Sequence, residues 1–417
     1  MEIKPVKNFV KTVVPAPDKS ITHRAIMFNS IAAGKAKITN ALLGNDCVST
    51  IDCMRKLGAH IETDGNTVTV EGRENPGSAK LDVGNSGTTF RLLCGLLSGR
   101  EGDFTLDGDS SIRSRPMKRV IEPLSLMGAD IVGTEGGRAP VAIHGRKLRG
   151  ISYKMPVASA QVKSAILLGG LSAEGITCVH EKIRSRNHTE LMLKAMGAKI
   201  WIENYTVSVM KSKLNAVNVE VPGDISSAAY AMVLAAVKQD AAVTLKNVGI
   251  NPTRAGIITV MKECGADIAF SSVKNNAEKS ADITVKYASG LKPFSLGKDI
   301  MPYLIDEIPA LAVLACFIEG TSVISGAEEL KVKETNRIDT TVGALKAMGA
   351  DIEATDDGMI IHGGKGLKGG AVIDPKGDHR IAMALSVAAA LSRDGAEILN
   401  PECAFVSYPG FYEMLSE

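Results

Sequence analysis

The sequence has few aromatic residues and almost no net charge. Phe, Trp and Tyr make up 4% of the 417 residues, with a single Trp, and the formal net charge is +2. Proteins that bind nucleic acid usually carry a broad basic face or aromatic side chains on which bases stack. The composition therefore argues against nucleic-acid binding, and basic residues that matter must act through local clustering.

Long apolar runs and paired cysteines are also missing. No apolar run reaches the roughly 18 residues that span a bilayer, and the N-terminus MEIKPVKNFV lacks the hydrophobic core of a signal peptide. The seven cysteines form no CxxC pair, so neither a zinc site nor a disulfide framework is indicated. We therefore expect a soluble protein of the reducing cytoplasm, and its length predicts at least two domains.

A helix that ends at a glycine and continues as a strand recurs along the chain. After the helix-ending glycine comes an alanine and then the strand, whose residues alternate in polarity. Glycine after a helix supplies the left-handed conformation that ends it. The five glycines, spaced 68 to 84 residues apart, are Gly58, Gly128, Gly197, Gly265 and Gly349.

A second kind of helix occurs six times between these segments. It opens on a polar residue and continues into a body that is apolar on nearly all sides, as in AQVKSAILLGGL and IAMALSVAAAL. Such helices are expected to be buried. The predicted starts are Ser20, Asn85, Ser159, Ser226, Asp306 and Asp378. The pattern predicts six units of about 70 residues, three in each domain, with the N-terminal strand within Glu2–Val10 completing the last unit.

Charged side chains gather where these helices begin. Helix N-termini carry unpaired N–H groups and about half a positive charge, so they bind phosphate and carboxylate. Arginine there opposes the dipole, and its repetition suggests a ligand with several negative charges. The basic residues near the starts of both kinds of helix are Lys19, Arg24, Arg91, Lys163, Arg380, Arg113, Arg115, Arg184, Arg186, Lys333 and Arg337. The fourth start, residues 223–227, has none.

We expect these helix starts to assemble one anion-binding cleft, with Asp306 and Glu334 as candidates for proton transfer. Taken alone, each residue has an ordinary explanation: Asp, Ser and Asn cap helices, Lys19 suits a solvated surface, and His379 suits a structural role. The sequence contains no Walker loop and no dinucleotide-binding glycine motif. The repetition, rather than any single residue, points to an anionic ligand.

Seven motifs occur in the order found in one protein family. They are DKSITHRA, GNSGTTFR, SRP, PVASAQVKSA, SRNHTELML, VKETNRI and GDHRIAMA. Over essentially the whole chain, they resemble the 3-phosphoshikimate 1-carboxyvinyltransferase (5-enolpyruvylshikimate-3-phosphate synthase) family of enolpyruvyl transferases. The resemblance implies a two-domain inside-out α/β barrel, each domain built from three βαβαββ repeats with buried helices. Domain 1 would comprise residues 1–13 and 224–417, and the inserted domain 2 residues 14–223.

The resemblance implies transfer of the enolpyruvyl group of phosphoenolpyruvate to the 5-hydroxyl of shikimate 3-phosphate, with release of phosphate. The reaction is an addition followed by an elimination, through a tetrahedral intermediate. It belongs to aromatic amino-acid biosynthesis and is the target of glyphosate. The family needs no metal or organic cofactor. We accordingly expect a cytoplasmic monomer whose partners are these two small molecules, with no nucleic-acid or membrane partner.

The resemblance also implies roles for individual residues. Shikimate 3-phosphate would be bound, mainly by domain 2, through Lys19, Ser20, Arg24, Ser159, Ala160, Gln161, Ser185, Asp306 and Lys333. Phosphoenolpyruvate would be bound by Lys19, Asn85, Gly87, Thr88, Arg115, Gln161, Arg186, Arg337 and Arg380. Domain 1 would clamp phosphoenolpyruvate and supply acid/base groups. The catalytic candidates are Asp306, Glu334 and Lys19, each open to either role, with Glu307 as the alternative to Asp306.

The chain departs from the family at two places. Val406 stands where many members carry a lysine of the phosphoenolpyruvate site, and Ala160 replaces a serine of the phosphate-binding motif, leaving only its backbone N–H. For glyphosate sensitivity, Gly87 and the Ala-Ser-Ala-Gln motif point in opposite directions.

Two other functions are alternatives to the one that the resemblance implies. UDP-N-acetylglucosamine 1-carboxyvinyltransferase shares the fold and the donor. It carries a cysteine in the loop that reads SSIRSRP here, and a Lys-Asn pair where this chain has Lys19-Ser20. A ring-like repeat scaffold that binds nucleic acid would need basic residues spread over a surface.

Overall fold

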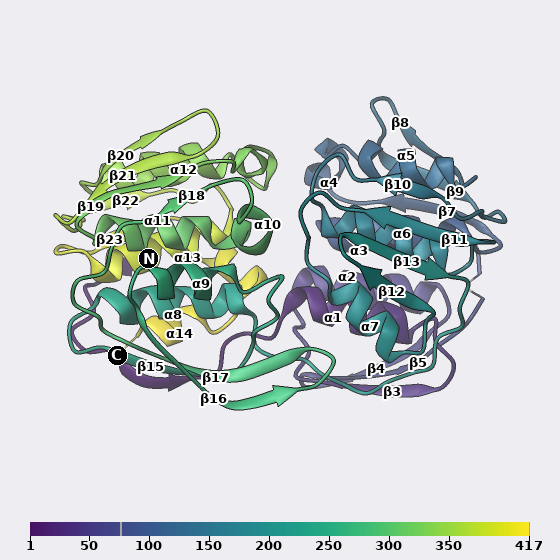
Figure 1. Cartoon of the computed structure of the whole chain (residues 1–417), viewed down its shortest axis with the longest axis horizontal. Helices are drawn as coiled ribbons and strands as arrows, with labels where there is room; N and C mark the ends of the chain where they lie inside the picture. The colour runs from purple at the N-terminus through teal and green to yellow at the C-terminus, as the bar shows by residue number, and fades with distance from the viewer. Residues whose placement is uncertain (76, 417) are drawn as a thin grey trace. The chain divides into compact units, whose positions relative to one another are not determined.

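The chain folds into two units, and unit 2 is inserted into unit 1. Unit 1 consists of Met1–Ala16 and Pro222–Glu417, and unit 2 of Pro17–Val221; Figure 1 shows the course of the chain in each. The computed structural model describes residues 1–75 and 77–416, so Pro76 and Glu417, the last residue of predicted domain 1, lie outside the described part. The sequence predicts the limits of the insertion at residues 14 and 223.

Unit 2 contains three four-stranded sheets of one pattern. The strand orders are β14-β3-β5-β4, β6-β7-β9-β8 and β10-β11-β13-β12. In each sheet the first two strands are parallel and the other neighbours antiparallel. The elements are α1 (Lys19–Asn29), β3 (Lys35–Thr39), α2 (Asn45–Lys56), β4 (His60–Asp64), β5 (Thr67–Glu71), β6 (Ala79–Asp82), α3 (Gly87–Ser98), β7 (Asp103–Asp107), α4 (Ser110–Ser114), α5 (Lys118–Leu126), β8 (Asp130–Thr134), β9 (Arg138–His144), β10 (Ser152–Lys154), α6 (Ala160–Gly170), β11 (Ile176–His180), α7 (His188–Ala195), β12 (Ile200–Glu203), β13 (Thr206–Met210) and β14 (Val219–Glu220).

Unit 1 uses the same pattern, except that one of its sheets has three strands. Its sheets have the orders β16-β17-β15-β2, β18-β19-β21-β20 and β1-β23-β22. The elements are β1 (Glu2–Ile3), β2 (Val10–Val13), α8 (Ile225–Val237), β15 (Ala242–Gly249), α9 (Gly256–Glu263), β16 (Asp267–Asn275), β17 (Lys279–Lys286), β18 (Ser295–Leu296), α10 (Met301–Leu304), η1 (Ile305–Glu307), α11 (Ile308–Cys316), β19 (Gly320–Ile324), η2 (Glu328–Val332), α12 (Arg337–Ala347), β20 (Asp351–Ala354), β21 (Met359–Gly363), β22 (Ala371–Ile373), α13 (His379–Leu391), β23 (Ala396–Ile398), η3 (Pro401–Val406) and α14 (Phe411–Leu415).

Three strands, β1, β2 and β14, pair with strands that are distant from them in sequence. β1 pairs antiparallel with β23, which confirms that the N-terminal strand completes the last unit, although Val10 belongs instead to β2. β2 directly precedes α1 but pairs in parallel with β15 of unit 1, whereas β14 directly precedes α8 but pairs in parallel with β3 of unit 2. The first and fourth βαβαββ repeats are therefore complete only because the chain crosses between the units twice.

The six apolar helices are buried inside their units, as predicted, and the sheets lie outside them. α8, α11 and α13 pack on one another in unit 1, and α3 packs on both α1 and α6 in unit 2. Their N-caps lie within two residues of the predicted starts: Asp18, Ser86, Ser159, Asp224, Glu307 and Asp378. The five predicted helix-ending glycines have φ between 86° and 99°. Among the described residues, no helix combines the length and apolar character needed to cross a membrane.

One glycine sets the spacing of α3 and α6. A Cβ on Gly95 would lie 2.0 Å from the carbonyl oxygen of Ala165, so only glycine allows the two backbones to approach this closely. The approach places the first turns of the two helices next to each other. Side chains from both starts can therefore meet.

Candidate active site

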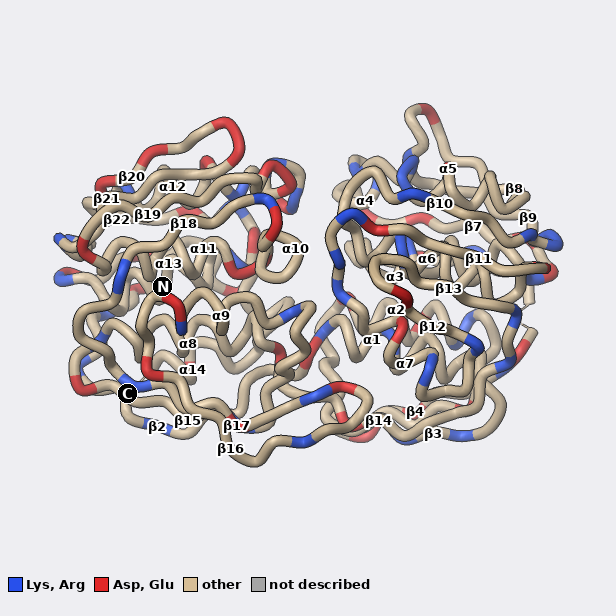
Figure 2. Tube along the Cα trace, viewed as in Figure 1, with Lys and Arg blue, Asp and Glu red and all other residues tan. Residues whose placement is uncertain are grey.

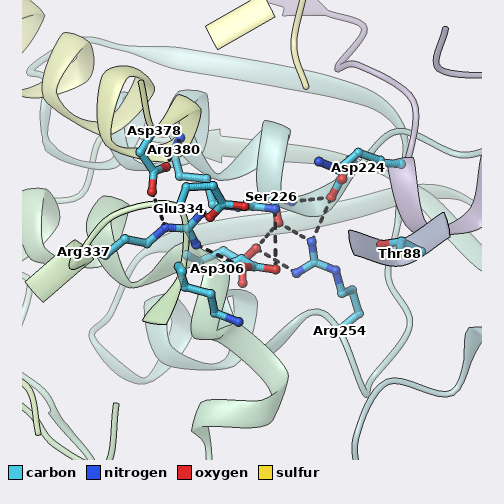
Figure 3. A network of polar contacts seen from close by, with 12 residues as sticks. Thr88, Asp224, Ser226, Arg254, Asp306, Glu334, Arg337, Asp378 and Arg380 are labelled. Atoms are coloured by element: carbon cyan, nitrogen blue, oxygen red, sulfur yellow. Dashed lines mark hydrogen bonds and ion pairs between the residues drawn. The ribbon is translucent and has the colours of Figure 1, made fainter. Parts of the chain in front are cut away.

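Arg337 lies at the centre of a buried ion network in unit 1 (Figure 3). Its side chain is 2% exposed, and Nε donates to Oδ2 of Asp378 at 2.8 Å. Nη2 donates to Oε2 of Glu334 at 2.6 Å. Burial alone would lower the pKa of Arg337, but Asp378, Glu334 and Asp306 together raise it above its ordinary value. Arg337 therefore stays charged inside the protein, and its direction is set by Asp378.

Asp306 lies between two arginines at longer distances. Its Oδ1 is 3.4 Å from Nη1 of Arg337, and its Oδ2 is 3.5 Å from Nη2 of Arg380. Hydrogen bonds of this kind are usually near 2.9 Å, so both contacts are weak. Burial lowers the pKa of Arg380, yet nearby groups, Asp306 first among them, raise it overall. A negatively charged ligand could replace these weak contacts with shorter ones.

Lys333 and Glu334 precede the helix that they were expected to open. They lie between η2 and α12, whose N-cap is Asn336. The Glu334 side chain is 33% exposed, and Lys333 Nζ is 3.9 Å from Oε2 of Glu329. Burial lowers the pKa of Lys333, against the opposite effect of Glu329 and Asp306, although 29% of its side-chain surface remains exposed.

The fourth helix start does have a basic residue, contrary to the sequence interpretation. Arg254, from the loop before α9, donates from Nη2 to Oδ1 of Asp224, the N-cap of α8, at 3.2 Å. The sequence holds a signal that could have found it. Basic residues precede α5, α7 and α12, and Arg254 is the corresponding residue before α9.

The start of α3 forms a second cluster, in unit 2. The amide of Gln161, in the first turn of α6, donates from Nε2 to Oγ1 of Thr88 at 3.0 Å, and its Oε1 accepts from Nη1 of Arg91. Arg115 Nη2 donates to Oδ1 of Asn85 at 3.1 Å. Arg91 was in a quoted motif but not among the predicted site residues.

Gly87 lies in the middle of this cluster. A Cβ there would be 3.1 Å from Nη1 of Arg115 and 3.2 Å from Nη1 of Arg91. Two guanidinium groups thus stand directly over the first residue of α3, where the helix N–H groups are unpaired. Guanidinium and amide donors at one place match a phosphate or carboxylate.

The start of α1 positions Lys19, Ser20 and Arg24. Arg24 is buried, with Nε donating to Oγ1 of Thr189 at 2.8 Å, Nη2 to Oγ of Ser164 at 3.0 Å and Nη1 to the carbonyl oxygen of Ser20 at 3.0 Å. It therefore joins α1 to α6 and α7.

Lys19, the first residue of α1, pairs with a carboxylate. Its Nζ is 3.1 Å from Oδ2 of Asp46, and its side chain is 19% exposed. Lys19 is thus partly accessible, and Asp46 supplies a local counter-charge.

Ser159 and Ser185 occupy different environments. Ser159 caps α6, which begins at Ala160, and Arg186 follows Ser185 before α7. The Ser185 hydroxyl donates to Oε1 of Glu181, whose Oε2 is 2.9 Å from Nζ of the buried Lys163. To bind a phosphate, the Ser185 hydroxyl would have to exchange that hydrogen bond.

The chain's own carboxylates supply part of the counter-charge that the sequence interpretation assigned to a ligand. Figure 2 shows Lys and Arg interleaved with Asp and Glu along the trace of each unit. Arg337 is bound by Asp306, Glu334 and Asp378, and Lys19 by Asp46. Of the two neighbours Asp306 and Glu307, Asp306 contacts Arg337 and Arg380, whereas Glu307 is bound to Arg254. Val406, the position of the family lysine, ends η3 and is partly buried.

Comparison with known protein families identifies one match along almost the whole chain. Residues 3–415 match the family model described as EPSP synthase (3-phosphoshikimate 1-carboxyvinyltransferase). The chain is 52% identical over 413 residues to the 3-phosphoshikimate 1-carboxyvinyltransferase of Thermoanaerobacter sp. (strain X514), covering 98% of this chain and 97% of the relative. It is 50% identical over 408 residues to the protein of that name from Bacillus subtilis (strain 168), covering 96% and 95%.

A solved structure shows the same fold. The structure described as EPSP synthase from Acinetobacter baumannii at 2.37 Å superposes with a TM-score of 0.89 and 43% sequence identity, covering 99% of this chain and 96% of that chain. The predicted mixed α/β architecture of repeated units with buried helices is therefore confirmed.

Proposed function

The chain belongs to the EPSP synthase family, and from this premise we infer that it transfers the enolpyruvyl group of phosphoenolpyruvate to the 5-hydroxyl of shikimate 3-phosphate, releasing phosphate. The observation that carries this inference is the match to one family over residues 3–415, joined by full-length relatives of one name. This match does not favour the alternative function, enolpyruvyl transfer to UDP-N-acetylglucosamine. The protein is thus a transferase of the shikimate pathway, which leads to the aromatic amino acids.

The reaction requires two proton transfers in each half. In the addition, the 5-hydroxyl oxygen bonds to C2 of phosphoenolpyruvate and loses its proton, while the methylene carbon gains one. In the elimination, the new methyl group loses a proton as the C2–O bond to phosphate breaks, and the departing phosphate gains one. The protein must therefore bind two phosphate groups and two carboxylates, and place acid and base groups near the 5-hydroxyl and near C3.

We propose that phosphoenolpyruvate is bound mainly by residues of the two clusters, with Lys19 and Arg186 in addition. In unit 1, Arg337 and Arg380 are charged guanidinium groups with weak contacts to Asp306 that an anion could replace. In unit 2, the helix start at Gly87 lies beside two arginines. The proposed set is Lys19, Asn85, Gly87, Thr88, Arg115, Gln161, Arg186, Arg337 and Arg380.

We assign shikimate 3-phosphate mainly to unit 2. The starts of α1 and α6 supply backbone N–H groups and short side chains that suit a phosphate. The proposed set is Lys19, Ser20, Arg24, Ser159, Ala160, Gln161, Ser185, Asp306 and Lys333. Ala160 would contribute its backbone N–H alone.

Asp306, Glu334 and Lys19 are the proposed acid/base residues. Two nearby guanidinium groups favour the ionised form of a carboxylate, which suits Asp306 to accept the hydroxyl proton. Glu334 is more exposed and pairs with Arg337. Glu307 is a poorer candidate because its side chain is fully buried against Arg254.

We also propose that the enzyme works as a monomer in the cytoplasm, without a nucleic-acid partner. The low net charge and the scattered cysteines support this setting. Size-exclusion chromatography with light scattering tests the first part, and retention on heparin in moderate salt tests the last.

An acceptor comparison tests the function. The purified protein is given phosphoenolpyruvate and either shikimate 3-phosphate or UDP-N-acetylglucosamine, and released phosphate is measured. We expect release with shikimate 3-phosphate only. Release with the nucleotide sugar alone, or with neither acceptor, would contradict the proposed function.

A further inference from the structure

Arg254 joins the starts of two buried helices in unit 1 (Figure 3). Its side chain is 3% exposed. Nη1 donates to Oε1 of Glu307 at 2.8 Å, and Nη2 donates to Oδ1 of Asp224 at 3.2 Å. Nη2 also donates to the hydroxyl of Ser226, which itself donates to Oε1 of Glu307. One guanidinium therefore links α8, which Asp224 caps, to α11, which begins after Glu307.

Glu307 and Asp306 are consecutive residues of η1, but their carboxylates have different surroundings. The Glu307 side chain is 0% exposed and contacts Arg254. The Asp306 side chain is 12% exposed and contacts Arg337 and Arg380. In a 3₁₀ turn, consecutive side chains point about 120° apart. Holding Glu307 on one side of the turn therefore determines the direction of Asp306 on the other.

Backbone packing connects the same two segments independently of the ion pairs. A Cβ on Gly256, the first residue of α9, would lie 2.9 Å from Cβ of Tyr303 and 3.1 Å from its carbonyl oxygen. Tyr303 belongs to α10, which continues directly into η1. The loop that carries Arg254 is thus in close contact with the segment that carries Asp306.

We propose that Arg254 is a positioning residue for the reaction: through Glu307 it orients η1 so that the carboxylate of Asp306 faces Arg337 and Arg380. The proposal rests on the proposed function, in which Asp306 exchanges a proton with the attacking hydroxyl. Arg254 acts on the Asp306 carboxylate indirectly, through the η1 turn. In this arrangement Glu307 anchors the turn to Arg254, and Asp306 takes part in the reaction.

Arginine suits this position because its planar fork reaches three acceptors on two helices. A lysine would provide one compact charge without that geometry. Removal of the guanidinium would take a positively charged partner from the buried carboxylates of Asp224 and Glu307, which is strongly unfavourable. The charge of Arg254 and the shape of its side chain therefore contribute separately to the orientation of η1. Arg254→Met removes both, whereas Arg254→Lys keeps the charge and changes the shape.

A double-mutant cycle on phosphate release tests the proposal. Arg254→Met, Asp306→Asn and the double variant are assayed with phosphoenolpyruvate and shikimate 3-phosphate. We expect Arg254→Met to lower kcat about 10- to 100-fold, with KM changed less than about threefold, because a misplacement of about 1 Å costs about 100-fold. In the Asp306→Asn background, the same change should lower kcat less than about threefold, because residues that act as a unit are not additive. Arg254→Lys should recover only part of kcat.

The control is Lys246→Met, which removes a 2.5 Å ion pair with Asp282 in a sheet of the same unit and should leave kcat unchanged. If Arg254→Met fails to fold, Glu307→Gln replaces it in the cycle with the same expected pattern. Equal losses in both backgrounds, or wild-type kcat in the single variant, would overturn the proposal while the proposed function stands. A wild-type protein that releases no phosphate from these substrates would overturn both.

Discussion

Arg337 donates from Nε to Oδ2 of Asp378 at 2.8 Å, and Oδ1 of the same carboxylate accepts the backbone N–H of Arg380 at 3.0 Å. One buried side chain therefore caps α13 and orients Arg337, while Arg380 is the second residue of that helix. Two of the arginines proposed to bind phosphoenolpyruvate, Arg337 through its side chain and Arg380 through its backbone N–H, thus donate to the same carboxylate.

Asp378→Asn should destabilise the protein by about 3 kcal/mol, because it removes the fully buried one of the three carboxylates that pair with the buried Arg337. Asn remains a good helix cap, so the loss reports the ion pair rather than the cap. The measurement is the free energy of unfolding in urea. Asp394→Asn, in the exposed pair with Arg393, should leave the transition midpoint unchanged. Equal stability of Asp378→Asn and the wild type would contradict the central place of this carboxylate.

Arg380→Ala should impair the use of phosphoenolpyruvate more than the binding of shikimate 3-phosphate. Removing a guanidinium that binds an anionic substrate typically costs at least about 3 kcal/mol, which corresponds to about 100-fold in kcat/KM for phosphoenolpyruvate. Titration calorimetry with shikimate 3-phosphate alone should give a Kd within about threefold of the wild-type value. The reverse pattern would mean that Arg380 belongs to the other substrate.

Gly87→Ala should raise KM for phosphoenolpyruvate by about tenfold, a free-energy change of about 1.4 kcal/mol. The added methyl would press against Nη1 of both Arg115 and Arg91, so these guanidinium groups must shift. Gly343→Ala in α12 is the matched control, because, apart from the backbone of α12 itself, a Cβ there meets no atom of the described residues within 4 Å. If both substitutions left KM unchanged, the helix start at Gly87 would not bind this substrate.

Stability should fall below about pH 6.5 because of His23. Its side chain is fully buried, with Nδ1 2.7 Å from Oγ1 of Thr50. Burial lowers the pKa of His23 from 6.5 to about 3; Asp46 raises it, and Lys19 and Arg24 lower it further. The folded state thus keeps His23 neutral where the unfolded chain binds a proton. This difference removes about 1.4 kcal/mol of stability between pH 7.5 and 5.5.

Urea unfolding at the two pH values measures this loss. His23→Asn should reduce the difference between pH 7.5 and 5.5 by about that amount. The exposed His60 provides the control, and His60→Asn should keep the wild-type difference. An unchanged pH dependence in His23→Asn would show that His23 does not titrate in this way.

The repeat period and the starts of the buried helices could be read from the sequence because they depend on local properties. Gly349 and Asp378 show this: helix-ending glycines and polar caps are encoded within a few residues. The basic residue before α9 has a sequence signal, but its pairing with Asp224 could not be read in the same way, because the two residues are 30 positions apart and meet through tertiary packing.

The choice between Asp306 and Glu307 also needed the structure. The two carboxylates are adjacent and chemically alike, and a 3₁₀ turn rather than a regular helix determines their directions. The strand exchange of β2 and β14 is similar, since pairing with β15 or β3 is a long-range choice. By contrast, the residues of the family motifs could be named from sequence alone, although their roles remain predictions.

The most direct measurement follows the oxygen that joins C2 of phosphoenolpyruvate to phosphorus. Phosphoenolpyruvate labelled with ¹⁸O at this bridging position is incubated with the protein and shikimate 3-phosphate, and both products are analysed by mass spectrometry. Enolpyruvyl transfer by addition and elimination breaks the C–O bond, so all of the label should appear in inorganic phosphate and none in the carboxyvinyl ether. Label retained in a three-carbon product such as pyruvate would mean that the P–O bond breaks, and would contradict enolpyruvyl transfer by this protein.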